Sequence, residues 1–413
     1  YAFFGYYPMI YIASLGVFLG VVFCLMAMLL LVEAKVIKKG NLVVVINEDE
    51  EKRLEAPNGV TLLSALVTHG ILLPSACGGS GSCGMCKCMV EEGGRGILPT
   101  ELPHLTRQER LKNVRLSCQL KLKEDLKIQI PAEIFNIKKY HTTAVSNDNV
   151  ASFIKELVLT LEGEEKFTFT AGAYIQIDIP EYELAYQDIE VVETYRPVWD
   201  QFHLWGLQAA SEEPVFRAYS MANTPAEQDF RFTVRIATPP PDAFGDIPPG
   251  VGSSYIFNLK PGDKVTLSGP YGDFFVKDSD REKCFIGGGA GMAPLRSQIV
   301  SQLRIAESNC KMTFWYGARS KKEMFYEAEF QELEKEFDNF SFFVALSDPE
   351  AENNWDGMKG FIHQCAHDRY LSTHSDPTEI EYYLCGPPGM LDATMEMLDS
   401  LGVEPEMIAY DKF

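Results

Sequence analysis

The chain has 413 residues, enough for two or three domains, and 23% of them are charged. Its formal net charge of −21 at pH 7 argues against nucleic acid as a partner, because a phosphate backbone attracts basic surfaces. Of the 10 cysteines, those outside the motif described below have no regular spacing, which indicates a reducing compartment. These scattered cysteines are Cys24, Cys88, Cys284, Cys310, Cys365 and Cys385.

The first predicted element is an apolar segment over residues 8–32 that contains no charged side chain. About 20 apolar residues are enough to cross a bilayer as a helix. Lys35, Lys38 and Lys39 follow directly, so the positive-inside rule predicts that the remaining chain faces the cytoplasm. A signal peptide is the alternative, but it would need a basic start, a shorter apolar core and a small-residue cleavage site. We therefore expect a single-pass transmembrane anchor over residues 1–35.

Residues 40–132 contain short predicted strands and one predicted helix. Leu42–Asn47 indicates a strand, Glu48–Arg53 a charged turn, and Thr61–His69 a short amphipathic helix. Alternating apolar residues then predict a pair of closing strands that ends at Pro131. This order predicts a ferredoxin domain of the β-grasp kind, which is an α+β fold.

Four cysteines of this region have the spacing of iron–sulfur ligands, namely Cys77, Cys83, Cys86 and Cys118. Zinc also binds four cysteines, but three ligands close together and a distant fourth favour a [2Fe–2S] cluster. Disulfides would require an oxidising compartment. The loop has five residues between its first two cysteines, where the plant pattern has four. Its glycines would let backbone N–H groups approach the cluster, and Cys88 is expected to be a thiol that is not a ligand.

Residues 136–280 show short strands separated by turn signals, the pattern of an antiparallel β-barrel. A long connection at 181–214 has no clear period, and such connections are usually functional or partner-facing. Along one predicted strand, an arginine, a tyrosine and a serine could neutralise a pyrophosphate, pack on a flavin and hydrogen-bond its polar edge. A later short helix could hold a phosphate at its N-terminus. The candidate FAD-binding residues are Arg217, Tyr219, Ser220, Asn223, Gly252, Ser253 and Ser254.

Residues 281–413 alternate strands and helices, which predicts an α/β doubly wound nucleotide-binding domain. A glycine-rich run after its first strand would let a pyrophosphate approach the N-terminus of the next helix. Two further strands end on the same edge, where ligands of such sheets bind. The candidate NAD-binding residues are Gly287, Gly288, Gly289, Gly291, Met292, Pro294, Gly317, Arg319, Cys385, Gly386 and Pro387.

Taken together, these motifs resemble the ferredoxin–NADP reductase superfamily. The four-cysteine loop, the membrane segment and the aromatic-rich insert make the chain similar to the F subunits of the Na⁺-translocating NADH:quinone oxidoreductases. That resemblance implies FAD as a prosthetic group, NADH as donor, and a place in the bacterial inner membrane beside sister membrane subunits, with quinone reached indirectly. It also implies that Phe413 stacks on the flavin. No side chain is then needed as acid or base, because NADH gives hydride to FAD and the cluster takes single electrons.

Two other classes of protein fit parts of the sequence. The reductase component of a multicomponent oxygenase has the same cofactors, but those reductases are generally soluble. A membrane scaffold with a degenerate nucleotide fold would not need intact glycine, arginine and cysteine motifs. The choice between NADH and NADPH stays open on the residues, because Arg319, Lys321 and Lys322 could bind a 2′-phosphate or form a solvated charged face.

Overall fold

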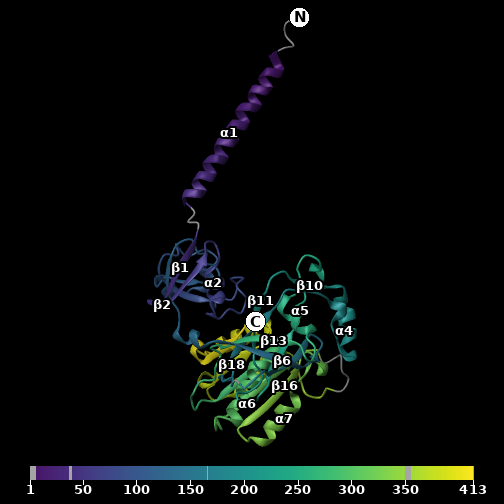
Figure 1. Cartoon of the computed structure of the whole chain (residues 1–413). Helices are drawn as coiled ribbons and strands as arrows, with labels where there is room; N and C mark the ends of the chain where they lie inside the picture. Colours follow the sequence, from purple (N-terminus) through teal and green to yellow (C-terminus); the bar gives the residue numbers. More distant parts are fainter. Residues whose placement is uncertain (1–5, 37–39, 165, 349–354, 413) are drawn as a thin grey trace. The chain divides into compact units, whose positions relative to one another are not determined.

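The computed structural model describes residues 6–36, 40–164, 166–348 and 355–412. Phe413, Lys38 and Lys39 therefore lie outside the described residues. The chain divides into two compact units, one with Gly79–Asn136 and the residues up to Ser75, the other with Ala76–Gly78 and Ile137–Phe413 (Figure 1). Each unit is described by itself.

Helix α1 (Tyr6–Val36) is a continuous helix of 31 residues, which corresponds to a length of roughly 46 Å at about 1.5 Å per residue. Its stretch Tyr11–Met28 has a mean hydropathy of 2.3, and the side chains there are exposed. A stretch this long and apolar is sufficient to cross a bilayer.

The first unit contains a five-stranded sheet with the strand order β2-β1-β5-β3-β4. β1 pairs with β2 in a hairpin and with β5 in parallel, and β5 and β4 flank β3 in antiparallel pairs. Thr61 starts helix α2 by accepting a hydrogen bond from Ser64 N, and the helix buries its leucines. The elements are β1 (Asn41–Ile46), β2 (Asp49–Pro57), α2 (Leu62–Thr68), β3 (Lys87–Glu92), α3 (Arg107–Leu111), β4 (Val114–Leu116) and β5 (Leu126–Gln129).

The predicted charged turn at Glu48–Arg53 is wrong. The turn is confined to Asn47 and Glu48, both with positive φ, and the charged residues from Asp49 onward belong to strand β2. β2 is at one edge of the sheet, so its charged side chains stay solvated while Leu54 and Ala56 enter the core.

The second unit begins with a six-stranded antiparallel sheet in the order β11-β8-β13-β6-β7-β12. After β11 the chain approaches the other edge of the sheet, where Ala222 N donates to Arg231 O at 2.7 Å. This bond makes the sheet a partly closed barrel, as predicted. Its strands are β6 (Lys138–Ala151), β7 (Ile154–Leu161), β8 (Tyr174–Ile179), β11 (Val215–Ser220), β12 (Phe230–Arg235) and β13 (Lys264–Tyr271), and helix α5 (Val251–Asn258) precedes β13.

The insert at 181–214 contains an antiparallel strand pair and a short helix, and its hydrophobic cluster also includes Ile236 and Phe257 of the barrel domain. Trp199 is fully buried there, and its indole Nε1 donates to Ser152 O at 2.8 Å. Aromatic side chains of the insert therefore pack against the barrel domain. These aromatic residues are irregularly spaced along the sequence. Its elements are β9 (Tyr182–Ala185), α4 (Arg196–Gln201) and β10 (Gln208–Ser211).

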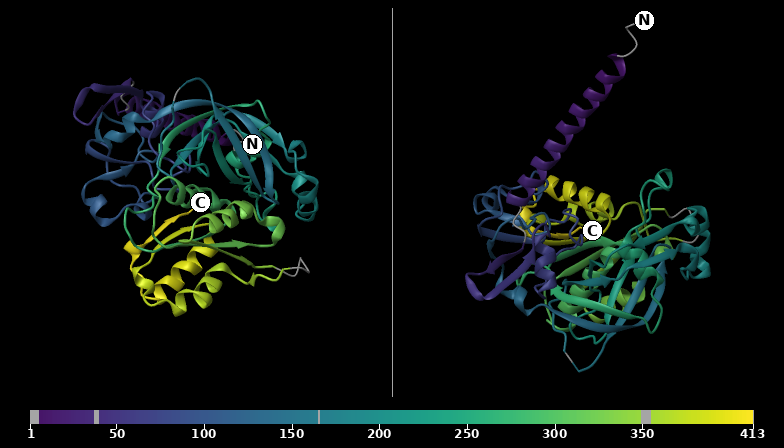
Figure 2. Two further views of the ribbon diagram at one scale, coloured as in Figure 1. Left: turned by 90° about the horizontal axis from the view of Figure 1, so that it is seen from below. Right: turned by 45° about the horizontal axis from the view of Figure 1, so that its top comes forward.

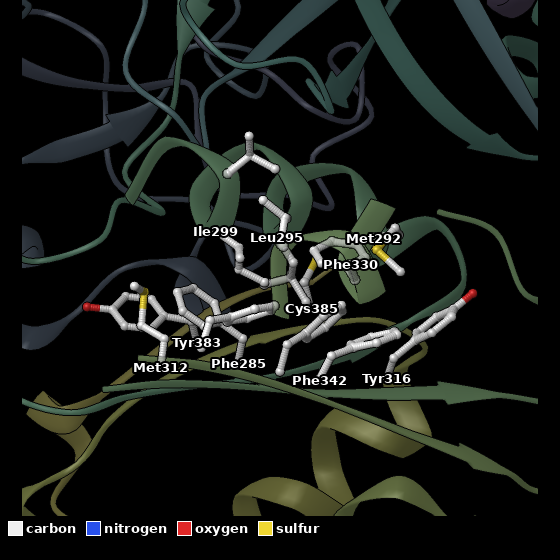
Figure 3. Close-up of a cluster of buried hydrophobic side chains, with 14 of the residues drawn as sticks. Phe285, Met292, Leu295, Ile299, Met312, Tyr316, Phe330, Phe342, Tyr383 and Cys385 are labelled. Atoms are coloured by element: carbon white, nitrogen blue, oxygen red, sulfur yellow. The ribbon is translucent and has the colours of Figure 1, made fainter. Parts of the chain in front are cut away.

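The last part of the second unit is a parallel six-stranded sheet in the order β17-β16-β15-β14-β18-β19. Helices α6 and α7 cover one face, where Phe285, Phe342 and Tyr383 lie in a buried cluster (Figure 3). Helices α8 and α9 cover the other face, and Figure 2 shows helices on both sides of the sheet. The elements are β14 (Lys283–Gly288), α6 (Met292–Arg304), β15 (Met312–Ala318), α7 (Glu327–Glu336), β16 (Phe340–Leu346), β17 (Met358–Lys359), α8 (Ile362–Arg369), β18 (Glu381–Cys385), α9 (Pro388–Ser400) and β19 (Ile408–Asp411).

Candidate functional site

Strand β11 and the start of helix α5 meet at the predicted flavin site. Arg217 and Tyr219 lie two residues apart on β11, so they share one face of the sheet. At Gly252, in the first turn of α5, a Cβ would lie 2.7 Å from Arg217 Cγ and 2.8 Å from Tyr219 Oη. The helix N-terminus can approach these side chains this closely only because residue 252 is glycine.

The charge of this site suits a pyrophosphate. Among the described residues, no carboxylate lies within ion-pair distance of Arg217, whose guanidinium donates to Phe216 O at 2.8 Å. The N-terminus of α5 adds positive potential. The charge of Arg217 beside this helix N-terminus therefore fits an anionic group.

The hydroxyls of Ser253 and Ser254 are used within the protein. Both donate to Gly250 O, at 3.2 and 2.7 Å, and Ser253 Oγ also accepts from Ala237 N at 3.0 Å. Tyr186 of the insert contacts Ser254 Oγ at 2.8 Å. These serines hold the turn that begins α5, which leaves the backbone amides of the turn for a phosphate.

Two other residues near this site have roles that the sequence did not reveal. Asn223 is buried, and its side-chain oxygen accepts from Arg231 N at 3.0 Å, so it joins the end of β11 to β12. Tyr182 of the insert was missed, although its hydroxyl donates to Val251 O at 2.5 Å. The insert therefore supports the start of α5, a role that only the tertiary contact reveals.

The glycine-rich turn after β14 forms a close-packed edge. A Cβ at Gly291 would lie 2.2 Å from Cys385 O, and one at Gly288 would lie 2.2 Å from Gly317 O. The carboxyl ends of β14, β15 and β18 thus come together at the N-terminus of α6, where a nucleotide pyrophosphate is expected to bind. Gly287 lies at the end of β14, Gly289 in the turn that follows it, and Gly386 and Pro387 in the turn after β18.

Met292 and Pro294 are buried in the first turn of α6. Met292 packs in the cluster under the helix, next to Leu295 and Cys385 in Figure 3. Only the main chain of these two residues is left to contact a ligand.

Cys385, Asp411 and Ser220 form a polar group where the barrel meets the nucleotide sheet. Cys385 pairs in register with Asp411 on β19, and Ser220 Oγ donates to Asp411 Oδ2 at 3.0 Å. Burial raises the pKa of Cys385 well above its usual range, and Asp411 adds to the shift, so Cys385 stays a neutral thiol. Cys385 is therefore suited to contact a ligand and not to act as a nucleophile.

Burial raises the pKa of Asp411 above its usual value, although the hydrogen bond from Ser220 opposes this. A carboxyl with a higher pKa in the folded state contributes stability at low pH, and the contribution is lost as pH rises through the folded pKa. We therefore expect Asp411→Asn to raise the melting temperature of the full chain at neutral pH, with the gain vanishing towards pH 4. Asp399→Asn, at an exposed position of α9, should show no such pH dependence. If Asp411→Asn raised the melting temperature equally at neutral pH and near pH 4, the raised pKa of Asp411 would be contradicted.

Three of the four candidate ligands, Cys83, Cys86 and Cys118, lie in the first unit, and Cys77 belongs to the second unit. Cys86 and Cys118 are buried, Cys77 and Cys83 are half-buried, and Ser117 N donates to Cys86 O at 2.8 Å. Within the described ranges, no three Cys, His, Asp or Glu side chains are gathered tightly enough to hold a metal ion. The assignment of these four cysteines as cluster ligands therefore remains a prediction.

The loop backbone depends on its glycines, since Gly78, Gly79, Gly81 and Gly84 all have positive φ. Gly84 has φ +69°, and a Cβ there would lie 2.8 Å from the His104 side chain. Burial raises the pKa of Cys88 to about 12, and the neighbouring Cys86 adds to the shift. Cys88 lies in strand β3 and pairs in register with Arg115 on β4, so it belongs to the sheet and not to the loop. Four other cysteines on a glycine-rich loop and a following turn fit an iron–sulfur cluster.

Comparison with protein families finds three domains in the order expected. Residues 45–123 match the 2Fe-2S iron-sulfur cluster binding domain, 201–276 the oxidoreductase FAD-binding domain, and 285–396 the oxidoreductase NAD-binding domain. A protein of Mannheimia succiniciproducens, named as the F subunit of a Na(+)-translocating NADH-quinone reductase, is 50% identical over 404 residues, covering 98% of both chains. Proteins with the same name from Neisseria meningitidis and Idiomarina loihiensis are 50% and 49% identical and cover 97% of this chain and 99% and 98% of theirs. The chain belongs to this family of F subunits.

Solved structures show how widely this family shares its fold. The Amycolatopsis cytochrome P450 reductase GcoB has a TM-score of 0.62 at 23% identity, which shows the fold alone. The ferredoxin reductase in carbazole 1,9a-dioxygenase has a TM-score of 0.58 at 25% identity, and each match covers 90% of this chain and 98% of the other. The oxygenase-type reductases are thus more distant from this chain than the F subunits are, so they support the alternative function less well.

Proposed function

We propose that this chain is the electron-input subunit of a Na⁺-pumping NADH:quinone oxidoreductase. The observation that carries the proposal is 50% identity to a named F subunit of such an enzyme over 98% of both chains. The order of its iron–sulfur, FAD-binding and NAD-binding domains supports the same function. The apolar helix α1 and the lysines after it support a bacterial inner-membrane anchor, with the other domains on the cytoplasmic side and sister membrane subunits as partners.

Different residues bind FAD, NADH and the iron–sulfur cluster. When bound, FAD takes a hydride from NADH and gives up its electrons singly, and the cluster carries one electron at a time. Arg217 and the N-terminus of α5 neutralise the FAD pyrophosphate, while the turn at Gly287–Gly291 receives that of NADH. Cys385 contributes a neutral thiol at the nicotinamide position. Asp411 accepts the hydrogen bond that Ser220 Oγ donates. Cys77, Cys83, Cys86 and Cys118 hold the cluster.

The end of strand β15 supports NADH over NADPH. Arg319 lies where a 2′-phosphate could bind, but its guanidinium is 3.4 Å from Asp348 Oδ2, and Asp348 N donates to Arg319 O at 2.9 Å. The carboxylate neutralises the arginine and would repel a phosphate dianion. A ribose hydroxyl could instead donate to the carboxylate.

The proposed function is tested by anaerobic mixing of the cofactor-loaded chain with NADH or NADPH while the flavin absorbance is followed. NADH should bleach the flavin at far lower concentrations than NADPH. Asp348→Ser should improve kcat/KM for NADPH by about tenfold, equivalent to about 1.4 kcal/mol, because the repulsion is removed. Asp368→Ser, an exposed carboxylate on α8, serves as control. A flavin that NADH does not bleach would refute the function, and equal use of both nucleotides by the unaltered chain would refute the role of Asp348.

A further inference from the structure

The segment that carries Cys118 is fixed by a buried ion pair. The Arg115 and Glu101 side chains are 1% and 0% exposed, and Arg115 Nη2 lies 2.7 Å from Glu101 Oε2. Glu101 Oε1 also accepts from Leu116 N at 2.8 Å, and Arg115 Nη1 donates to Gly94 O at 2.6 Å. A charged pair with this many bonds holds the end of β4 in one position, immediately before Ser117.

Both main-chain groups of Ser117 are also used. Its N–H donates to Cys86 O at 2.8 Å, and its carbonyl oxygen accepts from Leu63 N at 3.0 Å. Ser117 is therefore tied to one candidate cluster ligand through the backbone and is covalently joined to another, Cys118. These two hydrogen bonds hold the backbone of Ser117 in place.

The hydroxyl of Ser117 is nevertheless without a partner. The residue is 0% exposed, and within the described part of the chain its Oγ makes no hydrogen bond. Buried hydroxyls normally have a partner, because an unsatisfied one destabilises the fold. The hydroxyl is thus left for a group that the protein itself does not supply, on the residue that directly precedes the proposed ligand Cys118.

We propose that Ser117 Oγ donates a hydrogen bond to a sulfur of the [2Fe–2S] cluster and thereby raises its reduction potential. The proposal rests on the ligand assignment given under the proposed function. Reduction adds negative charge to the cluster, and a donor aimed at its sulfur stabilises that charge. Ser117 is then a residue that sets the potential at which the cluster accepts electrons, and not a ligand.

The experiment compares Ser117→Ala with Ser301→Ala in the full chain. Ser301 is the matched control, because its hydroxyl is also buried without a partner in the described residues but lies on α6 of the nucleotide domain. Redox titration followed by EPR should give a more negative cluster potential for Ser117→Ala and an unchanged one for Ser301→Ala. Ser117→Thr, which keeps a hydroxyl, should restore much of the difference. Pulsed EPR in D₂O should detect an exchangeable deuteron near the cluster that Ser117→Ala removes.

The outcomes separate this inference from the function it rests on. A Ser117→Ala protein with a normal cluster spectrum and an unaltered potential would overturn the hydrogen bond, as would an unchanged deuteron signal, since water would then be the partner of Ser117. An unaltered chain whose spectrum shows no cluster would instead overturn the ligand assignment. If Ser117→Ala fails to retain the cluster, the potential of the Ser117→Thr protein decides, because a value unlike that of the unaltered chain would refute the role of the hydroxyl.

Discussion

Gly291→Ala is expected to raise KM for NADH at least tenfold, equivalent to about 1.4 kcal/mol of binding, while FAD and the cluster are retained. The added Cβ would lie 2.2 Å from Cys385 O and 2.6 Å from Gly386 N. Both neighbours are backbone atoms at the end of β18, so the turn must move and the nucleotide edge widens. Overpacking of this kind also lowers the free energy of unfolding by about 1–3 kcal/mol.

Gly389→Ala is the matched control for this substitution. Gly389 lies in α9, and a Cβ there would meet no atom within 4 Å. Alanine favours helix over glycine by about 1 kcal/mol, so this variant should bind NADH normally and be as stable as the unaltered chain or more so. Titration of flavin bleaching with NADH measures both variants. A normal KM for Gly291→Ala would show that the nucleotide does not bind at this edge.

The positions of most strands and of the main motifs followed from local sequence patterns. The predicted strand at Leu42–Asn47 and helix at Thr61–His69 correspond to β1 and α2 within one residue at each end, because their apolar patterns end there at turn signals. The glycine-rich turn and the β11 motif could be predicted from short stretches of sequence. Closely spaced glycines allow a pyrophosphate to approach the backbone, and residues two apart on a strand share one face. Glu48–Arg53 was misplaced, because an edge strand can carry the charged residues that otherwise mark a turn.

The residues that sequence reasoning missed act through long-range contacts. Asp411 meets Ser220 across 191 positions, and Glu101 reaches the backbone of Leu116 from a different loop. Neither carboxylate belongs to a motif, so only the folded chain shows its partner. Ser253 and Ser254 remain predicted FAD-binding residues, and the structure adds that their hydroxyls hold the start of α5.

Cys83→Ala is expected to abolish electron transfer beyond the flavin and to leave reduction of the flavin by NADH intact. The substitution removes one of four thiolates from the proposed cluster, and Cys83 lies in the first unit, whereas Arg217 and Gly291 lie in the second. Quinone reduction by the assembled complex should therefore fall to background. Cys88→Ala is the control, because Cys88 lies in strand β3 outside the loop and is not expected to bind iron.

The most direct test of the central claim is rapid-freeze EPR of the assembled complex after mixing with NADH, combined with flavin absorbance. We expect the unaltered and Cys88→Ala complexes to show flavin bleaching together with the signal of a reduced [2Fe–2S] cluster. The Cys83→Ala complex should show the bleaching alone, without the cluster signal and without quinone reduction. Quinone reduction at the normal rate by the Cys83→Ala complex would contradict the proposed path of the electrons.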